Sequence, residues 1–333
     1  VVIDCKGKYI YPSFIDLFSD YGVTPPKGEG GGDFFNYQNI SNTKGAYNWN
    51  QALKPETDAS KLFNVNADKA KDLRGIGFGT VLTHMQDGIA RGTGTLVTLG
   101  SDKENLLMVK DKAAAFYSFN KGTSTQDYPN SLMGEIALLR QTFLDAQWYK
   151  TNPAKEGVNL SLKSWLDNQS LPQIFDASDK WNDLRADKIG DEFGVQYIIK
   201  GGGNEYQRIK EIADTKASYI LTLNYPAAID VDDANDLRFV GIDDLKHWEL
   251  APGNAAALEK AGVNFCLSTA DLANATDFMP NLRKAIEYGL TESKALEALT
   301  KTPAGMVGMY DKIGSIDNGK IASFIITSGP VFA

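Results

Sequence analysis

The stretch VQYIIKGGG, residues 195–203, decides the fold, because a short apolar run ends there in a glycine turn before a helical segment. Three similar runs occur in the second half of the chain, namely LPQIFDAS (171–178), ASYILTLNY (217–225) and VNFCLSTAD (263–271). The first three of the four runs begin about two dozen residues apart, a normal length for a strand plus a crossover helix. Runs that are apolar on both faces predict a parallel sheet covered by helices.

The segments around these runs contain predicted helices. Residues 179–194 end at Gly194, which suits a helix C-cap. Residues 130–149 have apolar positions at spacings of three and four, which predicts an amphipathic helix. The first half is less regular, and there the pattern predicts strands within 78–88 and 93–101.

The composition is that of an ordinary globular protein and excludes several classes of function. Of the 333 residues, 43% are hydrophobic and 23% are charged. The net charge of -8, without a basic stripe, argues against nucleic-acid binding, which depends on clustered Lys and Arg. No apolar run is long enough to cross a bilayer. The two widely spaced cysteines form neither a disulfide framework nor a cysteine-based zinc site.

Repeated strand–helix units predict either a (β/α)8 barrel or a doubly wound sheet. We favour the barrel, because no G-x-G-x-x-G sequence follows the first strand and the chain has room for eight units. The apolar segments at the two ends of the chain then form a small accessory sheet.

Two motifs at the ends of the chain resemble those of a known family. GKYIYPSFID (7–16) is similar to the opening motif of the amidohydrolase superfamily, near its imidazolonepropionase-like and cytosine-deaminase-like branches. GLTESKALEALTKTPAGMVGMYDKIGSIDNGKIASFII (289–326) is similar to the closing motif. Ser323 departs from that motif, since the family usually has Asp there.

The resemblance implies an α/β fold with a TIM-like (β/α)8 barrel over residues 12–313. It also implies a small β-sandwich built from both termini, of which 1–11 and 314–333 are the remaining strands. Phrases such as YNWNQALKPE (47–56) further resemble the degenerate first half of long proteins with two tandem amidohydrolase units. The chain is then expected to be a fragment of a longer polypeptide.

Family members hydrolyse C–N or related bonds with one or two metal ions, and the resemblance implies ligands at the C-terminal ends of the strands. The expected histidines are absent. The positions that match them, and the position of the family aspartate, are occupied as follows: Phe18 and Asp20 after the first strand, Asp176 after the fifth, Lys200 after the sixth, and Ala270 or Asp271 after the eighth. The resemblance therefore implies a barrel mouth without the family's ligand set.

The charged residues at these positions allow different interpretations. Asp20, Asp176 and Asp271 can form an oxygen-rich site for zinc, manganese or magnesium. Alternatively no metal binds, and Lys200 replaces the lost positive charge, because buried carboxylates without a cation are costly. A lysine with a perturbed pKa can also act as a base or nucleophile. His84 ends a predicted strand and is a candidate acid–base group or a hydrogen-bonded structural residue.

Three further residues are candidates for substrate binding. Arg91 lies in a glycine-rich segment and can hold an anion. Tyr47 and Trp49 belong to the long loop 23–60 and supply rigid contact area. A connection of this length is usually functional or disordered.

We carry three hypotheses for the function. The first is a degenerate, metal-free barrel that serves as the structural or regulatory half of a larger hydrolase, beside a catalytic amidohydrolase unit in the same longer chain. The second is a metal-dependent hydrolase of amide or cyclic amide bonds, with Asp271, His84 and Lys200 as catalytic residues. The third is a module that binds a small molecule or peptide. A homodimer is compatible with each, and an extracytoplasmic location follows only if the longer parent chain is secreted.

Overall fold

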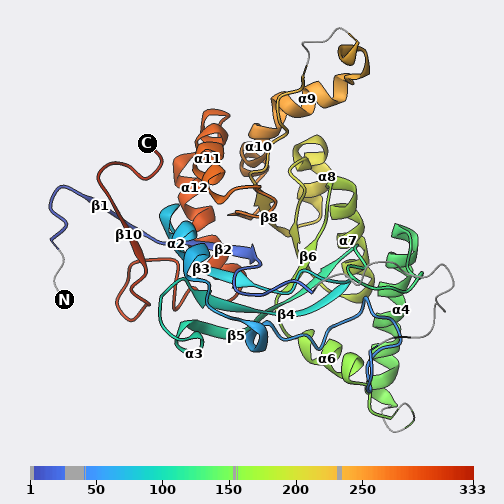
Figure 1. Cartoon of the computed structure of the whole chain (residues 1–333). Coiled ribbons are helices and arrows are strands. Elements are labelled where there is room, and N and C mark those ends of the chain that lie inside the picture. The colour runs from blue at the N-terminus through green and yellow to red at the C-terminus, as the bar shows by residue number, and fades with distance from the viewer. Residues whose placement is uncertain (1–3, 27–40, 42, 153–154, 156, 231–234) are drawn as a thin grey trace.

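The chain folds around one large mixed sheet (Figure 1). The computed structural model describes residues 4–26, 41, 43–152, 155, 157–230 and 235–333. The strands of the large sheet are β2 (Phe14–Ser19), β3 (Phe78–Thr83), β4 (Ala90–Thr98), β5 (Met108–Ser118), β6 (Gln173–Asp176), β7 (Tyr197–Lys200), β8 (Ser218–Thr222) and β9 (Phe265–Ser268). Each is hydrogen-bonded to the next in sequence order. The four apolar runs of the second half are confirmed as strands β6 to β9.

The direction of β4 departs from the predicted repeat of strand and helix. β4 pairs antiparallel with both β3 and β5, whereas the other neighbouring pairs of the large sheet are parallel. Only residues 84–89 separate β3 from β4, and a parallel connection needs a dozen residues or more. The short connection therefore produces a β3–β4–β5 meander where the sequence predicted further strand–helix units.

The large sheet is not closed into a barrel. Within the described residues, no backbone ladder joins the first strand, β2, to the last strand, β9. The carboxylate of Asp16 bridges them instead: Oδ1 accepts from Ser268 Oγ at 2.6 Å, and Oδ2 accepts from the Thr269 N–H at 3.0 Å. A backbone donor that a ladder would use is thus taken by a side chain. The prediction is confirmed as a mixed α/β fold with a mainly parallel sheet, and the closed (β/α)8 barrel is not seen.

Helices stand around the large sheet (Figure 1). They are α1 (Ala59–Leu62), α2 (Ala67–Gly75), α3 (Glu104–Leu107), α4 (Leu132–Thr151), α6 (Leu160–Asn168), α7 (Lys180–Phe193), α8 (Ile209–Asp214), α9 (Ile242–Leu250), α10 (Asn254–Lys260), α11 (Phe278–Glu287), α12 (Glu292–Leu299) and α13 (Lys301–Met306). Short 3-10 turns are η1 (Glu205–Arg208), η2 (Asp236–Phe239), η3 (Ala251–Gly253) and η4 (Ala275–Asp277). None of the helices in the described part of the chain is long and apolar enough to span a bilayer.

Two local predictions for helices are confirmed. The amphipathic pattern of 130–149 is α4, which buries Leu139 and Phe143 on the predicted face. Gly194 ends α7 in the left-handed conformation, with φ of 71°. That conformation is easy for glycine and costly for residues with a Cβ atom, which explains why the helix ends there.

The two ends of the chain meet in a second, two-stranded sheet (Figure 1). β1 (Tyr9–Pro12) pairs antiparallel with β10 (Phe324–Thr327). Just before β10, Ser323 Oγ lies 2.6 Å from Ser13 Oγ, so the residue that departs from the family motif is hydrogen-bonded between the two sheets. The division of the chain at residues 12 and 313 remains a prediction.

Candidate functional site

Four charged side chains gather where the strands of the large sheet end. Asp176 and Lys200 are the last residues of β6 and β7 and are neighbours across that ladder. Asp271 follows β9 in the chain. Arg91 lies at the start of β4, which reaches the same edge because β4 runs opposite to its neighbours. We call Arg91, Asp176, Lys200 and Asp271 the mouth network.

The mouth network is a continuous line of ion pairs. Arg91 Nη1 lies 2.9 Å from Asp176 Oδ2, and Lys200 Nζ lies 3.4 Å from Asp176 Oδ1. Lys200 Nζ also donates to Asp271 Oδ2 at 2.5 Å. Two positive and two negative groups therefore balance each other across the strand ends.

Because the two cations are buried, losing a carboxylate partner would be costly. The side chains of Arg91 and Lys200 are each 6% exposed. Burial by itself lowers the pKa of Lys200, but the nearby carboxylates of Asp176 and Asp271 outweigh it, and the pKa of Lys200 is raised above its usual value. The raised pKa favours the ammonium form of Lys200, and this does not support its use as a neutral base or nucleophile.

Asp20, the third carboxylate of the predicted oxygen-rich site, lies outside the mouth network. Its carboxylate pairs with Lys69 of α2, with Lys69 Nζ at 3.3 Å from Oδ1, and both side chains are about half exposed. The side chain of Asp20, which matches a ligand position of the family, is thus paired with α2 and not placed beside Asp176. The structure does not assemble Asp20, Asp176 and Asp271 into one site.

His84 is packed among aromatic rings at the same edge of the sheet. Its ring stacks on Phe116 with 3.6 Å between centroids and meets the edge of Phe18 at 4.7 Å. His84 is fully buried, and among the described residues no partner lies within hydrogen-bonding geometry of either ring nitrogen. Burial, followed by the charge of Arg91, lowers the pKa of His84 well below its usual value. The neutral form of the imidazole is therefore favoured, and the role of His84 stays a prediction.

Phe18 fills the space beside these groups. It is 4% exposed and stands where the family has a histidine. Lys200 Nζ lies 5.5 Å from the centre of its ring, which is within range of a cation–π interaction. The ring therefore contributes packing and a weak electrostatic contact.

Asp271, and not Ala270, belongs to the mouth network. The carbonyl of Ala270 accepts from Thr222 Oγ1 at 2.6 Å, while the carboxylate of Asp271 bonds to Lys200. Asp271 has a left-handed backbone with φ of 63°, which is uncommon for a residue other than glycine. The backbone conformation directs its side chain at Lys200 at some cost in local strain.

The residues at this edge do not fit the family's divalent metal. Among the residues that the structure describes, no three His, Cys, Asp or Glu side chains are grouped to hold a metal ion. Asp176 and Asp271 both face the ammonium of Lys200, and an ammonium repels a metal ion at the same place. The side chains form a charge-balanced network, and no catalytic step through a metal follows from them.

The three predicted substrate-binding residues differ in exposure. Arg91 is buried and has its Nε bonded to the carbonyl of Gly88 at 3.1 Å. Trp49, which is 40% exposed, stacks on Tyr128 with 6.2 Å between ring centres. Tyr47 is 37% exposed. Much of the long loop 23–60, namely residues 27–40 and 42, lies outside the described residues.

Asp16 and Asp183 are among the buried carboxylates that sequence reasoning missed. Asp16 is fully buried. Its carboxylate accepts a hydrogen bond from Ser268 at the end of β9, across the open side of the sheet. Asp183 of α7 is also fully buried, and within the part of the chain that the structure describes neither of its carboxylate oxygens has a hydrogen-bond partner. Burial, and then the charges of Glu205 and Asp179, raise the pKa of Asp183 well above its usual value. For Asp16, the available signal was a carboxylate inside the apolar strand FIDLFS.

Comparisons with known proteins identify the fold. A search of curated protein sequences gives no match. Among solved structures, an amidohydrolase from Thermotoga maritima MSB8 is similar over 99% of this chain and 84% of its own, with 23% identity and a TM-score of 0.74. A prolidase complexed with N-methylphosphonate-L-proline is similar over 99% of this chain and 82% of its own, with 14% identity and a TM-score of 0.50. At these identities the likeness concerns the fold.

The sequence itself also matches a family. The model of the amidohydrolase family matches residues 248–332, a segment that contains β9, α11 to α13 and β10. This segment includes the closing motif that carries the resemblance in the sequence. Over this segment the chain is similar in sequence to the amidohydrolase family, and over the rest of the chain the likeness to an amidohydrolase is one of fold.

Proposed function

We propose that this chain is a non-catalytic amidohydrolase fold that serves as the structural or regulatory half of a larger hydrolase. The observation that carries the proposal is the position of Lys200. Its buried ammonium binds the carboxylates of Asp176 and Asp271 at the strand ends, where the superfamily has its catalytic groups. A site that is already neutralised from within has no free charge with which to bind a metal ion.

The energetics support the same proposal. A metal ion could bind Asp176 and Asp271 only if Lys200 and Arg91 first lost their partners. Separating a buried ion pair leaves an uncompensated buried charge and typically costs about 3–5 kcal/mol. His84 does not reduce this cost, since its ring is held between Phe18 and Phe116.

The alternative, a hydrolase with a carboxylate-rich site, finds less support. It needs Asp20 beside Asp176 and Asp271, and Asp20 is instead paired with Lys69. The two carboxylates that remain are fewer than the roughly six oxygen ligands that hard cations prefer. His84 has a lowered pKa because it is buried, which disfavours the protonated form that a general acid needs.

Metal analysis of the purified protein tests the proposal. The protein is grown with zinc, manganese and iron and purified without chelator, and the expected metal content is at background. The matched variant Lys200→Ala removes the ammonium, which frees Asp271 and leaves Asp176 paired with Arg91 alone, so it is expected to bind added manganese more tightly than the wild type does. About one tightly bound metal per wild-type chain would overturn the proposal.

The proposed partner is a second amidohydrolase unit in the same longer chain. Reading the coding sequence on both sides of this segment tests that part directly. We expect a neighbouring unit that keeps the metal-binding histidines, and we expect its thermal unfolding midpoint to fall when it is produced without this chain. A neighbouring unit whose stability and kcat are independent of this chain would leave no structural or regulatory role.

A further inference from the structure

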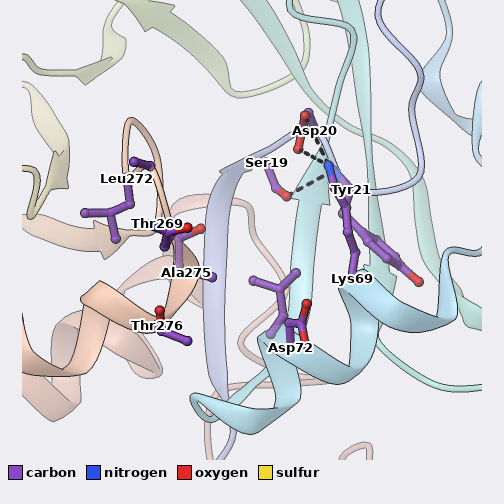
Figure 2. Close-up of a pocket in the computed structure, with 12 residues that line it drawn as sticks. Ser19, Asp20, Tyr21, Lys69, Asp72, Thr269, Leu272, Ala275 and Thr276 are labelled. Carbon is purple, nitrogen blue, oxygen red and sulfur yellow. Dashed lines mark hydrogen bonds and ion pairs between the residues drawn. The ribbon is translucent and has the colours of Figure 1, made fainter.

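A cavity of about 470 Å³ lies beside the open side of the sheet, outside the mouth network. It is bounded by the end of β2, by α2 and by the loop after β9. Figure 2 shows Lys69 and Asp72 on the α2 side, and Leu272, Ala275 and Thr276 on the opposite side. The volume is within the range of small-molecule sites, which is about 300–1,000 Å³. We call it the seam cavity.

The charged groups of the seam cavity are accessible. Lys69 Nζ lies 3.3 and 3.5 Å from the two carboxylate oxygens of Asp20. The two side chains are 53% and 48% exposed, and ion pairs this exposed contribute little to stability. A ligand can therefore separate Lys69 from Asp20 at a low cost.

Asp72 gives the cavity a carboxylate that is not neutralised. It lies three residues after Lys69 on α2, so both side chains project from the same side of the helix. Asp72 is exposed and, within the described residues, takes part in no ion pair. Asp20, Lys69 and Asp72 together leave one negative charge on the lining.

The remaining wall of the cavity is partly apolar. Leu73 of α2 and Leu272 of the loop after β9 are both half-buried and line the cavity from opposite sides. Apolar walls with a few convergent polar groups are typical of sites for small molecules. A lining that contains the carboxylate of Asp72 and two leucines suits a ligand with a cationic group and a short aliphatic chain.

We propose that the seam cavity binds a small aliphatic ammonium compound. Its ammonium group pairs with Asp72, and its hydrocarbon part contacts Leu73 and Leu272. Lys69 opposes this binding by occupying Asp20, so the cavity's affinity depends on how far that pair is opened. The proposal is independent of whether the mouth network is catalytic.

Titration with n-butylammonium, followed by saturation-transfer NMR and calorimetry, tests the proposal, with 1-butanol and butyrate as matched neutral and anionic probes. Butylammonium is expected to bind more tightly than either. Asp72→Asn is expected to weaken it about fivefold, the effect of one exposed ion pair. Asp111→Asn removes the same charge from an exposed position of β5 outside the cavity and is expected to change little.

A second pair of variants separates local binding from general electrostatics. Lys69→Met frees Asp20 and is expected to raise the affinity for butylammonium, whereas Lys71→Met removes the same charge from a residue outside the cavity. These positions are exposed, so the variants should keep the wild-type melting temperature. Equal binding of butylammonium and 1-butanol, or equal effects of Asp72→Asn and Asp111→Asn, would overturn the proposal.

Discussion

Asp16 and Asp176 lie in the same sheet and are stabilised in opposite ways. Asp16, which is fully buried, accepts hydrogen bonds from neutral donors: the N–H groups of Phe18 and Thr269 and the hydroxyls of Ser268 and Thr269. Asp176, whose side chain is 22% exposed, is bound by two cations, Arg91 and Lys200. The first carboxylate joins the edges of the open sheet, and the second joins the strand ends.

The difference shows what each arrangement can tolerate. Hydrogen bonds from neutral groups do not cancel the charge, and burial raises the pKa of Asp16 despite its donors. Arg91 and Lys200 cancel the charge of Asp176. Loss of that carboxylate would leave buried positive charge without a partner, which destabilises the fold. The removal of each carboxylate should therefore have a different cost.

The largest effect is expected for Asp176→Asn. The substitution keeps the shape of the side chain but leaves the 6%-exposed guanidinium of Arg91 without its carboxylate, and loss of one partner of a buried pair costs about 3–5 kcal/mol. Asp16→Asn should cost less, about 1–3 kcal/mol, because only neutral donors lose an acceptor. Urea unfolding at pH 7 measures both free energies.

Asp20→Asn is the control for this comparison. It removes a carboxylate whose ion pair is about half exposed, so its cost should stay below about 1 kcal/mol. If Asp16→Asn lowers the free energy of unfolding as much as Asp176→Asn does, the cost of losing the carboxylate does not depend on whether its partners are neutral donors or cations.

Some features of this sheet could be predicted from the sequence, and others could not. Apolar periodicity is enough for β6 to β9 and α4, since burial sets these patterns directly. The pairing of Asp176 with Lys200 follows from their positions at the ends of neighbouring parallel strands. Strand direction is not encoded in this way, and the antiparallel β4 depends on the short connection before it.

The sequence did not predict which distant segments contact Asp20 and Asp16. Asp20 was expected near Asp176 because it follows a strand, but a lysine on α2 lies closer. Asp16 was treated as part of an apolar strand, and its partners in residues 268–269 are far along the chain. Neither contact leaves a local pattern, since each depends on how the first strand meets the rest of the fold.

Asp183 extends the comparison to a carboxylate that no donor or cation among the described residues binds. Its pKa is raised in the folded state, so the folded protein holds a proton that the unfolded chain releases above about pH 4. Stability from this group is complete below that pH and is lost as the pH rises towards the folded-state pKa. The slope is at most about 1.4 kcal/mol per pH unit for one proton.

Asp183→Asn should remove that slope. The variant is expected to resemble the wild type near pH 4 and to be the more stable protein at pH 8, because the amide is neutral throughout. Urea unfolding at one-unit pH intervals measures the difference. A variant that is less stable than the wild type at every pH would mean that Asp183 is ionised and bound in the folded protein.

A small effect is also expected at Asp271, at the exposed end of the mouth network. Its side chain is 43% exposed, so the pair with Lys200 is partly screened by water. Asp271→Ala and Asp271→Gly both remove this pair, but only glycine relieves the left-handed backbone. The glycine variant should therefore be the more stable of the two by about 1 kcal/mol, measured from their thermal unfolding midpoints. If alanine is tolerated equally, the backbone conformation imposes no strain, and the ion pair alone would account for the position of Asp271.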